Sequence, residues 1–144
     1  MSLILEGHSV SPRQPAPSPA PARKLSVRVA GARKIVTTQL PAFSRKLAAM
    51  LDAGMPIVAA LQALEHQETN RSFRQVIFEV RCNIENGLSL SESLEPFPQI
   101  FDDLYCSMVR GGESGGRLPE TAARLAEMLE ARAALRRRVR GALI

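Results

Sequence analysis

The sequence contains no tryptophan and few aromatic residues of any kind. Five Phe and one Tyr account for the 4% of aromatic side chains among its 144 residues. Carbohydrate clefts, aromatic cages and base-stacking surfaces all depend on exposed rings. The composition therefore argues against these three kinds of binding site.

The chain also has no long apolar run and only two cysteines, Cys82 and Cys106. No apolar run approaches the roughly 18 residues of a membrane-spanning helix, and the N-terminus lacks the pattern of a signal peptide. Two cysteines are too few for a disulfide framework and suit a reducing cytosol. Because neither cysteine has a histidine beside it in the sequence, we expect buried thiols rather than nucleophiles.

Basic charge is plentiful, but it lies at the two ends of the chain. The formal net charge is +5. Residues 1–36 hold six basic side chains and one acidic one, residues 37–131 hold eight basic and thirteen acidic ones, and residues 132–144 hold five arginines and no acid. A DNA-binding domain should carry its positive charge on the folded surface that meets the phosphates. We therefore expect no nucleic-acid partner, and a soluble nucleic-acid-binding helical module that uses the basic termini is the alternative.

The composition changes near residue 36. Residues 11–21 read SPRQPAPSPAP, with five prolines in eleven residues. Such a stretch is typical of a flexible or polyproline II spacer. We therefore interpret residues 1–36 as a flexible, disordered Pro/Ala-rich basic leader, and we expect no stable fold over residues 22–36.

From Thr37 onward the apolar residues follow a helical period, and no strand-like alternation appears. Turn and cap signals divide residues 37–140 into six helices. These signals are Gly54 with Pro56, Thr69–Asn70, Gly87, the capping box Ser89-x-x-Glu92, Pro96 with Pro98, the pair Gly111–Gly112, and Pro119. The sequence therefore predicts an all-α fold, a six-helix bundle with short loops.

The last predicted helix ends on arginines. They are Arg132, Arg136, Arg137, Arg138 and Arg140, and they precede the apolar residues at 141–144. Arginines before an apolar segment are typical of cytoplasmic juxtamembrane sequence, so residues 141–144 are interpreted as the start of a membrane helix that this chain lacks. A solvated helix end, attraction to anionic lipid and nucleic-acid binding are the interpretations of the arginine cluster.

The string GGESGG at residues 111–116 does not indicate a nucleotide site. A phosphate-binding loop follows a strand and is followed by a lysine, and neither condition holds here. We expect a tight reversal between two helices, in which glycines permit left-handed angles or close helix approach. Glu113 is expected to accept backbone N–H bonds and to pin this turn.

No set of residues indicates catalysis, a cofactor or a metal. Glu65, His66 and Glu68 are poorly spaced for three ligands of one ion. Asp102 and Asp103 open a helix, where negative charge is favoured by the helix dipole. We expect no metal site and no enzyme activity. The candidates for a divalent ion, if another acidic helix end lies near, are Asp102, Asp103 and Glu113.

Four motifs in order resemble the type II secretion system F domain family. They are FSRKLAAMLDAGMPIVAALQALE at residues 43–65, GLSLSESL at residues 87–94, MVRGGESGGRL at residues 108–118, and LAEMLE at residues 125–130 with the arginine-rich tail. The resemblance covers residues 36–144. The family's motif glycines and glutamate fall on Gly54, Gly87, Gly112, Glu113 and Gly116, where the resemblance implies that they shape the bundle and its contact surface.

The resemblance implies the first cytoplasmic domain of an inner-membrane platform protein of type II secretion or type IV pilus assembly. Such a protein docks the assembly ATPase and couples it to the extrusion of pilin or pseudopilin subunits, without being catalytic itself. The implied partners are that ATPase, other inner-membrane assembly proteins, and one or more further copies of the chain. The implied location is the cytoplasmic face of the bacterial inner membrane, reached through membrane segments missing from this chain.

Overall fold

The structure is a computed structural model, and it describes residues 26–143. The elements are α1 (Ala32–Lys34), the π-helix η1 (Ile35–Gln39), α2 (Leu40–Asp52), α3 (Ile57–Gln67), α4 (Arg71–Glu85), α5 (Leu90–Leu94), α6 (Asp103–Ser114) and α7 (Leu118–Ala142). Because α1, η1 and α2 follow one another without a break, the described residues form six helices and no strand. The predicted all-α, six-helix fold is confirmed. The part of the predicted leader at residues 1–25, and Ile144 of the predicted membrane helix, lie outside the described residues.

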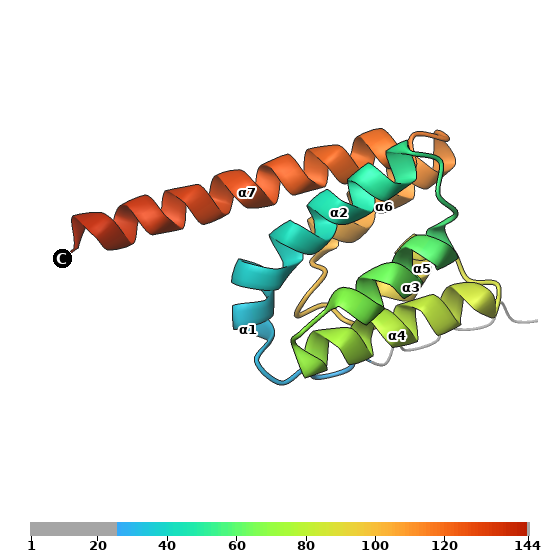
Figure 1. Ribbon diagram of the computed structural model, residues 1–144, viewed down its shortest axis with the longest axis horizontal. Coiled ribbons are helices and arrows are strands. Elements are labelled where there is room, and N and C mark those ends of the chain that lie inside the picture. The colour runs from blue at the N-terminus through green and yellow to red at the C-terminus, as the bar shows by residue number, and fades with distance from the viewer. Residues whose placement is uncertain (1–25, 144) are drawn as a thin grey trace, which may run out of the picture.

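The helices form two packed groups (Figure 1). In one group α2 lies along α7, and α6 packs against α7. In the other group α3 and α4 form a pair joined by a short loop, as expected for antiparallel neighbours. The short α5 lies between α4 and α6 and links the two groups. The C-terminal part of α7 extends beyond the rest of the domain (Figure 1).

Aromatic side chains form the centre of the core. The rings of Phe43 and Phe73 meet edge to face at 5.1 Å between centroids, and those of Phe101 and Tyr105 are tilted at 5.1 Å. The hydroxyl groups of Ser44 and Tyr105 share a buried hydrogen bond of 2.8 Å that joins α2 to α6. Burial raises the pKa of Tyr105, so its hydroxyl stays protonated and available for this bond. These rings are therefore used for packing.

Side-chain caps fix the start of three helices. Asn70 Oδ1 accepts a hydrogen bond from Phe73 N at 3.0 Å, and Ser89 Oγ accepts one from Glu92 N at 3.1 Å. Asp102 Oδ1 accepts a bond of 2.8 Å from the backbone N–H of the third residue of α6. Each cap satisfies an amide that has no partner within the helix, which is worth about 1 kcal/mol. Capping at these three positions is as predicted.

The first helix begins at Ala32, five residues before the predicted start. Val27 N donates a hydrogen bond of 2.7 Å to Pro96 O, and Ile35 is completely buried. The prediction of no stable fold over residues 22–36 is therefore wrong from Val27 onward. Packing of the Ile35 side chain into the core outweighs the basic, weakly patterned composition around it, because tertiary contacts supply most of the stability of a helix.

Candidate functional site

Three of the five predicted motif positions are turns at helix ends. Gly54 follows α2, Gly87 follows α4 and Gly116 follows α6, with φ angles of 83°, 98° and 66°. Residues with a Cβ rarely adopt such angles, and a glycine after the last helical turn is the usual solution. These glycines allow the chain to reverse direction between the packed helices. At these three positions the motif therefore concerns the shape of the bundle rather than a chemical reaction.

Gly112 serves the close approach of two helices. The helix α6 continues to Ser114, so its predicted end at Gly111–Gly112 is wrong. Gly112 is buried where α6 meets α7, and a Cβ added there would lie 2.8 Å from Thr121 Cβ. Gly112 therefore lies inside α6 and not at a turn. The absence of a side chain at this position leaves room for Thr121 of α7. Only the second half of GGESGG forms the reversal.

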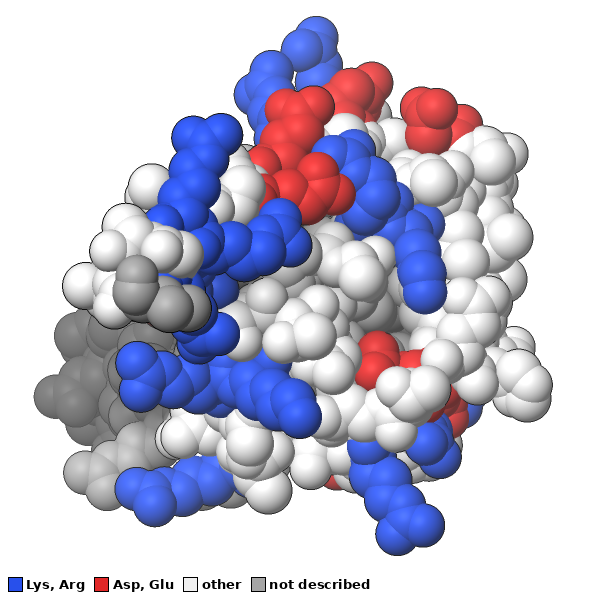
Figure 2. All heavy atoms as spheres, turned by 60° about the vertical axis from the view of Figure 1, so that its left-hand side comes forward, with Lys and Arg blue, Asp and Glu red and all other residues white. Residues whose placement is uncertain are grey.

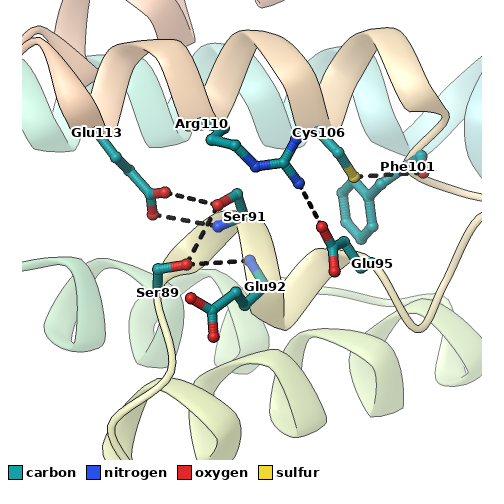
Figure 3. Close-up of polar contacts among 8 residues, drawn as sticks. All are labelled: Ser89, Ser91, Glu92, Glu95, Phe101, Cys106, Arg110 and Glu113. Carbon is teal, nitrogen blue, oxygen red and sulfur yellow. Dashed lines mark hydrogen bonds and ion pairs between the residues drawn. The ribbon is translucent and has the colours of Figure 1, made fainter. Parts of the chain in front are cut away.

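Glu113 binds the neighbouring helix. Its Oε1 accepts a hydrogen bond of 3.1 Å from Ser91 N, and its Oε2 accepts one of 2.7 Å from Ser91 Oγ (Figure 3). Ser91 lies in the first turn of α5, where the backbone amide has no partner within its own helix. The prediction that Glu113 stabilises its own glycine turn is therefore wrong, because its hydrogen bonds come from Ser91 of α5. The carboxylate does accept a backbone N–H bond, but from a different helix.

A second contact holds the other end of α5. Arg110, one turn before Glu113 on α6, pairs with Glu95 at the C-terminal end of α5 (Figure 3). We call these four residues, Ser91, Glu95, Arg110 and Glu113, the α5–α6 clasp. Sequence reasoning missed three of them. The available signal in the sequence was the spacing of the two pairs. Arg110 and Glu113 are three residues apart on α6, and their partners Glu95 and Ser91 are four residues apart at α5.

The structure does not bring the three candidate ion ligands together. Asp102 and Asp103 lie at the start of α6, and Glu113 lies ten residues further along it, about 15 Å along the axis. Asp102 caps the helix and Glu113 holds the clasp. Across residues 26–143, no group of three or more His, Cys, Asp or Glu side chains is placed to hold a metal ion.

The two cysteines lie on α4 and α6, and Glu65, His66 and Glu68 lie at the C-terminal end of α3. Cys106 is buried, and burial raises the pKa of its thiol to about 11, which keeps it protonated. Cys82 is half-buried and unpaired with Cys106. Glu65 accepts an ion-pair contact of 2.9 Å from Arg81, so its carboxylate is used between α3 and α4.

The arginines of α7 face the first helix across a groove. One part of the groove has a volume of about 460 Å³, the adjoining part about 1080 Å³, and both are lined by Thr37, Thr38, Arg136 and Arg140. The basic side chains along it, which define what we call the basic groove, are Arg33, Lys34, Arg136, Arg137 and Arg140. Sequence reasoning placed the first two in an unfolded leader and therefore missed this arrangement.

The remaining arginines and the apolar residues of α7 lie elsewhere on the helix. Arg132 and Arg138 are exposed and do not line the groove. Leu135, Val139 and Leu143 are 62%, 52% and 81% exposed and follow one another at intervals of four residues. Within residues 26–143, none of the helices is both long enough and apolar enough to cross a membrane.

Comparison with known proteins shows where these motifs belong. The family profile described as "Type II secretion system (T2SS), protein F" matches residues 43–144. The chain belongs to this family. The match begins at Phe43, in the aromatic core. It includes the α5–α6 clasp and the α7 arginines of the basic groove.

Individual members of the protein F family are similar over most of this chain. The type IV pilus assembly protein PilC of Thermus thermophilus is 43% identical over 104 residues, which are 72% of this chain and 25% of that protein. The type II secretion system protein F of Vibrio cholerae is 36% identical over 123 residues, 85% of this chain and 30% of its own length. PilC of Pseudomonas aeruginosa is 31% identical over 127 residues, 88% of this chain and 34% of its own. The chain thus spans about a quarter to a third of these relatives.

Proposed function

We propose that this chain is a cytoplasmic docking domain of an inner-membrane platform protein in type II secretion or type IV pilus assembly. It lies at the cytoplasmic face of the bacterial inner membrane, binds the assembly ATPase and couples it to the extrusion of pilin or pseudopilin subunits. The observation that carries the proposal is the family match over residues 43–144, together with names of relatives that refer to both machines. The domain acts through binding and is not an enzyme.

The contacts of the motif residues support a binding role. Gly112 and Gly116 set the approach and the reversal of α6 and α7, and Glu113 fastens α5 to α6. These contacts fix the positions of α5, α6 and α7 relative to one another. A preformed surface of this kind reduces the cost of ordering side chains on binding.

Co-purification with the assembly ATPase of the same secretion or pilus system tests the proposal. The tagged chain at micromolar concentration should retain the ATPase or a second copy of itself. Glu113→Ala, which releases one end of α5, should weaken retention, whereas Glu127→Ala on the exposed side of α7 should not. Retention of neither the ATPase nor a second copy by the folded wild-type chain would contradict the proposal.

The basic groove favours a nucleic-acid-binding module as the second candidate function. This candidate requires an affinity for duplex DNA that falls steeply with salt, because cations on the protein release counterions from the phosphates. The affinity should survive deletion of residues 1–25. The deletion should stop there, since residues from Val27 onward contact the body and Ile35 is part of the core. Absence of salt-dependent binding removes this candidate.

A further inference from the structure

We infer that the basic groove binds the phosphate headgroups of anionic phospholipids at a membrane surface. This inference goes beyond the proposed docking function and does not depend on it. The groove joins parts of the chain that are about a hundred residues apart, because Arg33 and Lys34 come from α1 while Arg136 and Arg140 come from α7. Figure 2 shows Lys and Arg side chains gathered on this end of the molecule.

Among the described residues, no ion pair compensates the basic charge of the groove. All five basic side chains are exposed, and none has an ion-pair partner among the described residues. Glu130 is the acidic residue among the described residues that line the groove, and its carboxylate is bound by Arg45 at 2.8 Å. The hydrogen bond from Arg45 lowers the pKa of Glu130. Several like charges along one concave surface create a field that attracts anions.

The other groups in the groove suit phosphate. Thr38 lines both parts of the groove and Gln99 lines the larger part, whereas the Thr37 hydroxyl already donates a hydrogen bond of 3.1 Å to Lys34 O. Phosphate oxygens accept several hydrogen bonds at once, and the planar guanidinium group is well matched to them. Both threonines belong to the π-helical turn η1, and single π-helical turns occur frequently at functional sites.

Exposed apolar side chains favour lipid over a free anion. Val139 and Leu143 lie in the last turns of α7, between and after the arginines, and more than half of each side chain is exposed. A soluble phosphate would leave them in water. Arginines combined with exposed apolar residues at one helix end are typical of segments that lie in the membrane interface, where apolar burial and attraction to anionic headgroups act together.

Vesicle co-sedimentation of the 144-residue chain tests this inference. The probes are vesicles of phosphatidylcholine alone and vesicles that also contain phosphatidylglycerol, both at about 0.15 M salt. We expect the chain to bind only the anionic vesicles. Arg136→Gln with Arg140→Gln, and separately Arg33→Gln with Lys34→Gln, should each lower the partition constant about tenfold.

Matched variants separate a groove from diffuse attraction. Arg132→Gln with Arg138→Gln removes the same charge from the same helix outside the groove, and it should lower binding less than about threefold. Arg136→Lys with Arg140→Lys keeps the charge but removes the planar guanidinium groups, so it should lower binding less than the Gln pair does, which also guards against a folding defect. Equal losses in all three Gln pairs, or no effect of the α1 pair, would overturn the inference. So would full release by inorganic phosphate at matched ionic strength, which would identify a site for free phosphate.

Discussion

The two halves of α7 use one helical face in opposite ways. In the first half that face carries Ala126 and Leu129, which are buried against the body. Steps of three and four residues place Arg136 and Arg140 on the continuation of the same face, where both are exposed and line the basic groove. The helix continues because Ala, Leu and Arg are strong helix formers. Helix formation and burial are therefore separate properties here, and the second half is available for binding.

Leucine truncation should give the largest contrast between the halves. Leu125 is 1% exposed and Leu135 is 62% exposed. Leu125→Ala should lower the free energy of unfolding by about 2–5 kcal/mol, because it leaves a cavity in the core. Leu135→Ala should change it by less than about 0.5 kcal/mol. Chemical denaturation of the two variants measures both values, and similar losses would show that the second half is packed in solution.

Adjacent glycines of α6 should respond to alanine with opposite signs. Gly112→Ala should destabilise the domain by about 1–3 kcal/mol, because the new Cβ would collide with Thr121 at the contact with α7. Gly111 has open space around it, so Gly111→Ala should stabilise the helix by about 0.5–1 kcal/mol. Thermal melting of the two variants measures both changes in stability. Stabilisation by both would mean that α6 and α7 are further apart than described.

Removing the carboxylate of the clasp should have an intermediate effect. Glu113→Ala leaves the Ser91 amide and hydroxyl without their acceptor, at a cost of about 1–3 kcal/mol. Glu113→Gln keeps one acceptor oxygen and should cost less. Glu127→Ala, on an exposed site of α7, is the control and should lie within about 0.5 kcal/mol of wild type. Hydrogen exchange of the α5 amides should rise in Glu113→Ala before the rest of the domain opens.

The smallest effect concerns the contact at the junction of the two halves of α7. The hydrogen bond from Arg45 lowers the pKa of Glu130 below its ordinary value of 4.5. A lowered folded-state pKa stabilises the fold at higher pH, and this contribution is lost as pH falls through that pKa. NMR titration should therefore show the Glu130 carboxyl group ionised at a lower pH than an isolated glutamate side chain. Arg45→Gln should return its pKa to the ordinary range, and an unchanged titration would refute the contact in solution.

The caps and the family motifs were accessible from sequence because their signals are local. Asn70, Ser89 and Asp102 each act on an amide three residues away, and the glycine turns depend on one residue's backbone. The bond between Glu113 and Ser91 joins residues 22 positions apart, and no local pattern reports such a pair. The burial of Ile35 could not be predicted for the same reason, since it depends on a core formed by residues elsewhere in the chain.

The basic groove shows the same limit more strongly. The arginines of α7 were evident as a cluster, but their counterparts on α1 lie about a hundred residues earlier in a stretch without a clear helical pattern. Only the packing of α2 along α7 brings the two sets together. Composition located the charge along the chain, and the tertiary fold determined which charges face one another.

The length of α7 has a mechanical consequence. Residues 131–143 extend about 20 Å along the axis at 1.5 Å per residue, and they continue directly from the part that packs on α2. Between Pro119 in the first turn and Gly141 near the end, α7 contains no proline or glycine that would let it bend. The helix is therefore a stiff lever. A sideways force at its outer end acts as a torque on α2, so displacement there is transmitted to the body instead of being absorbed by a hinge.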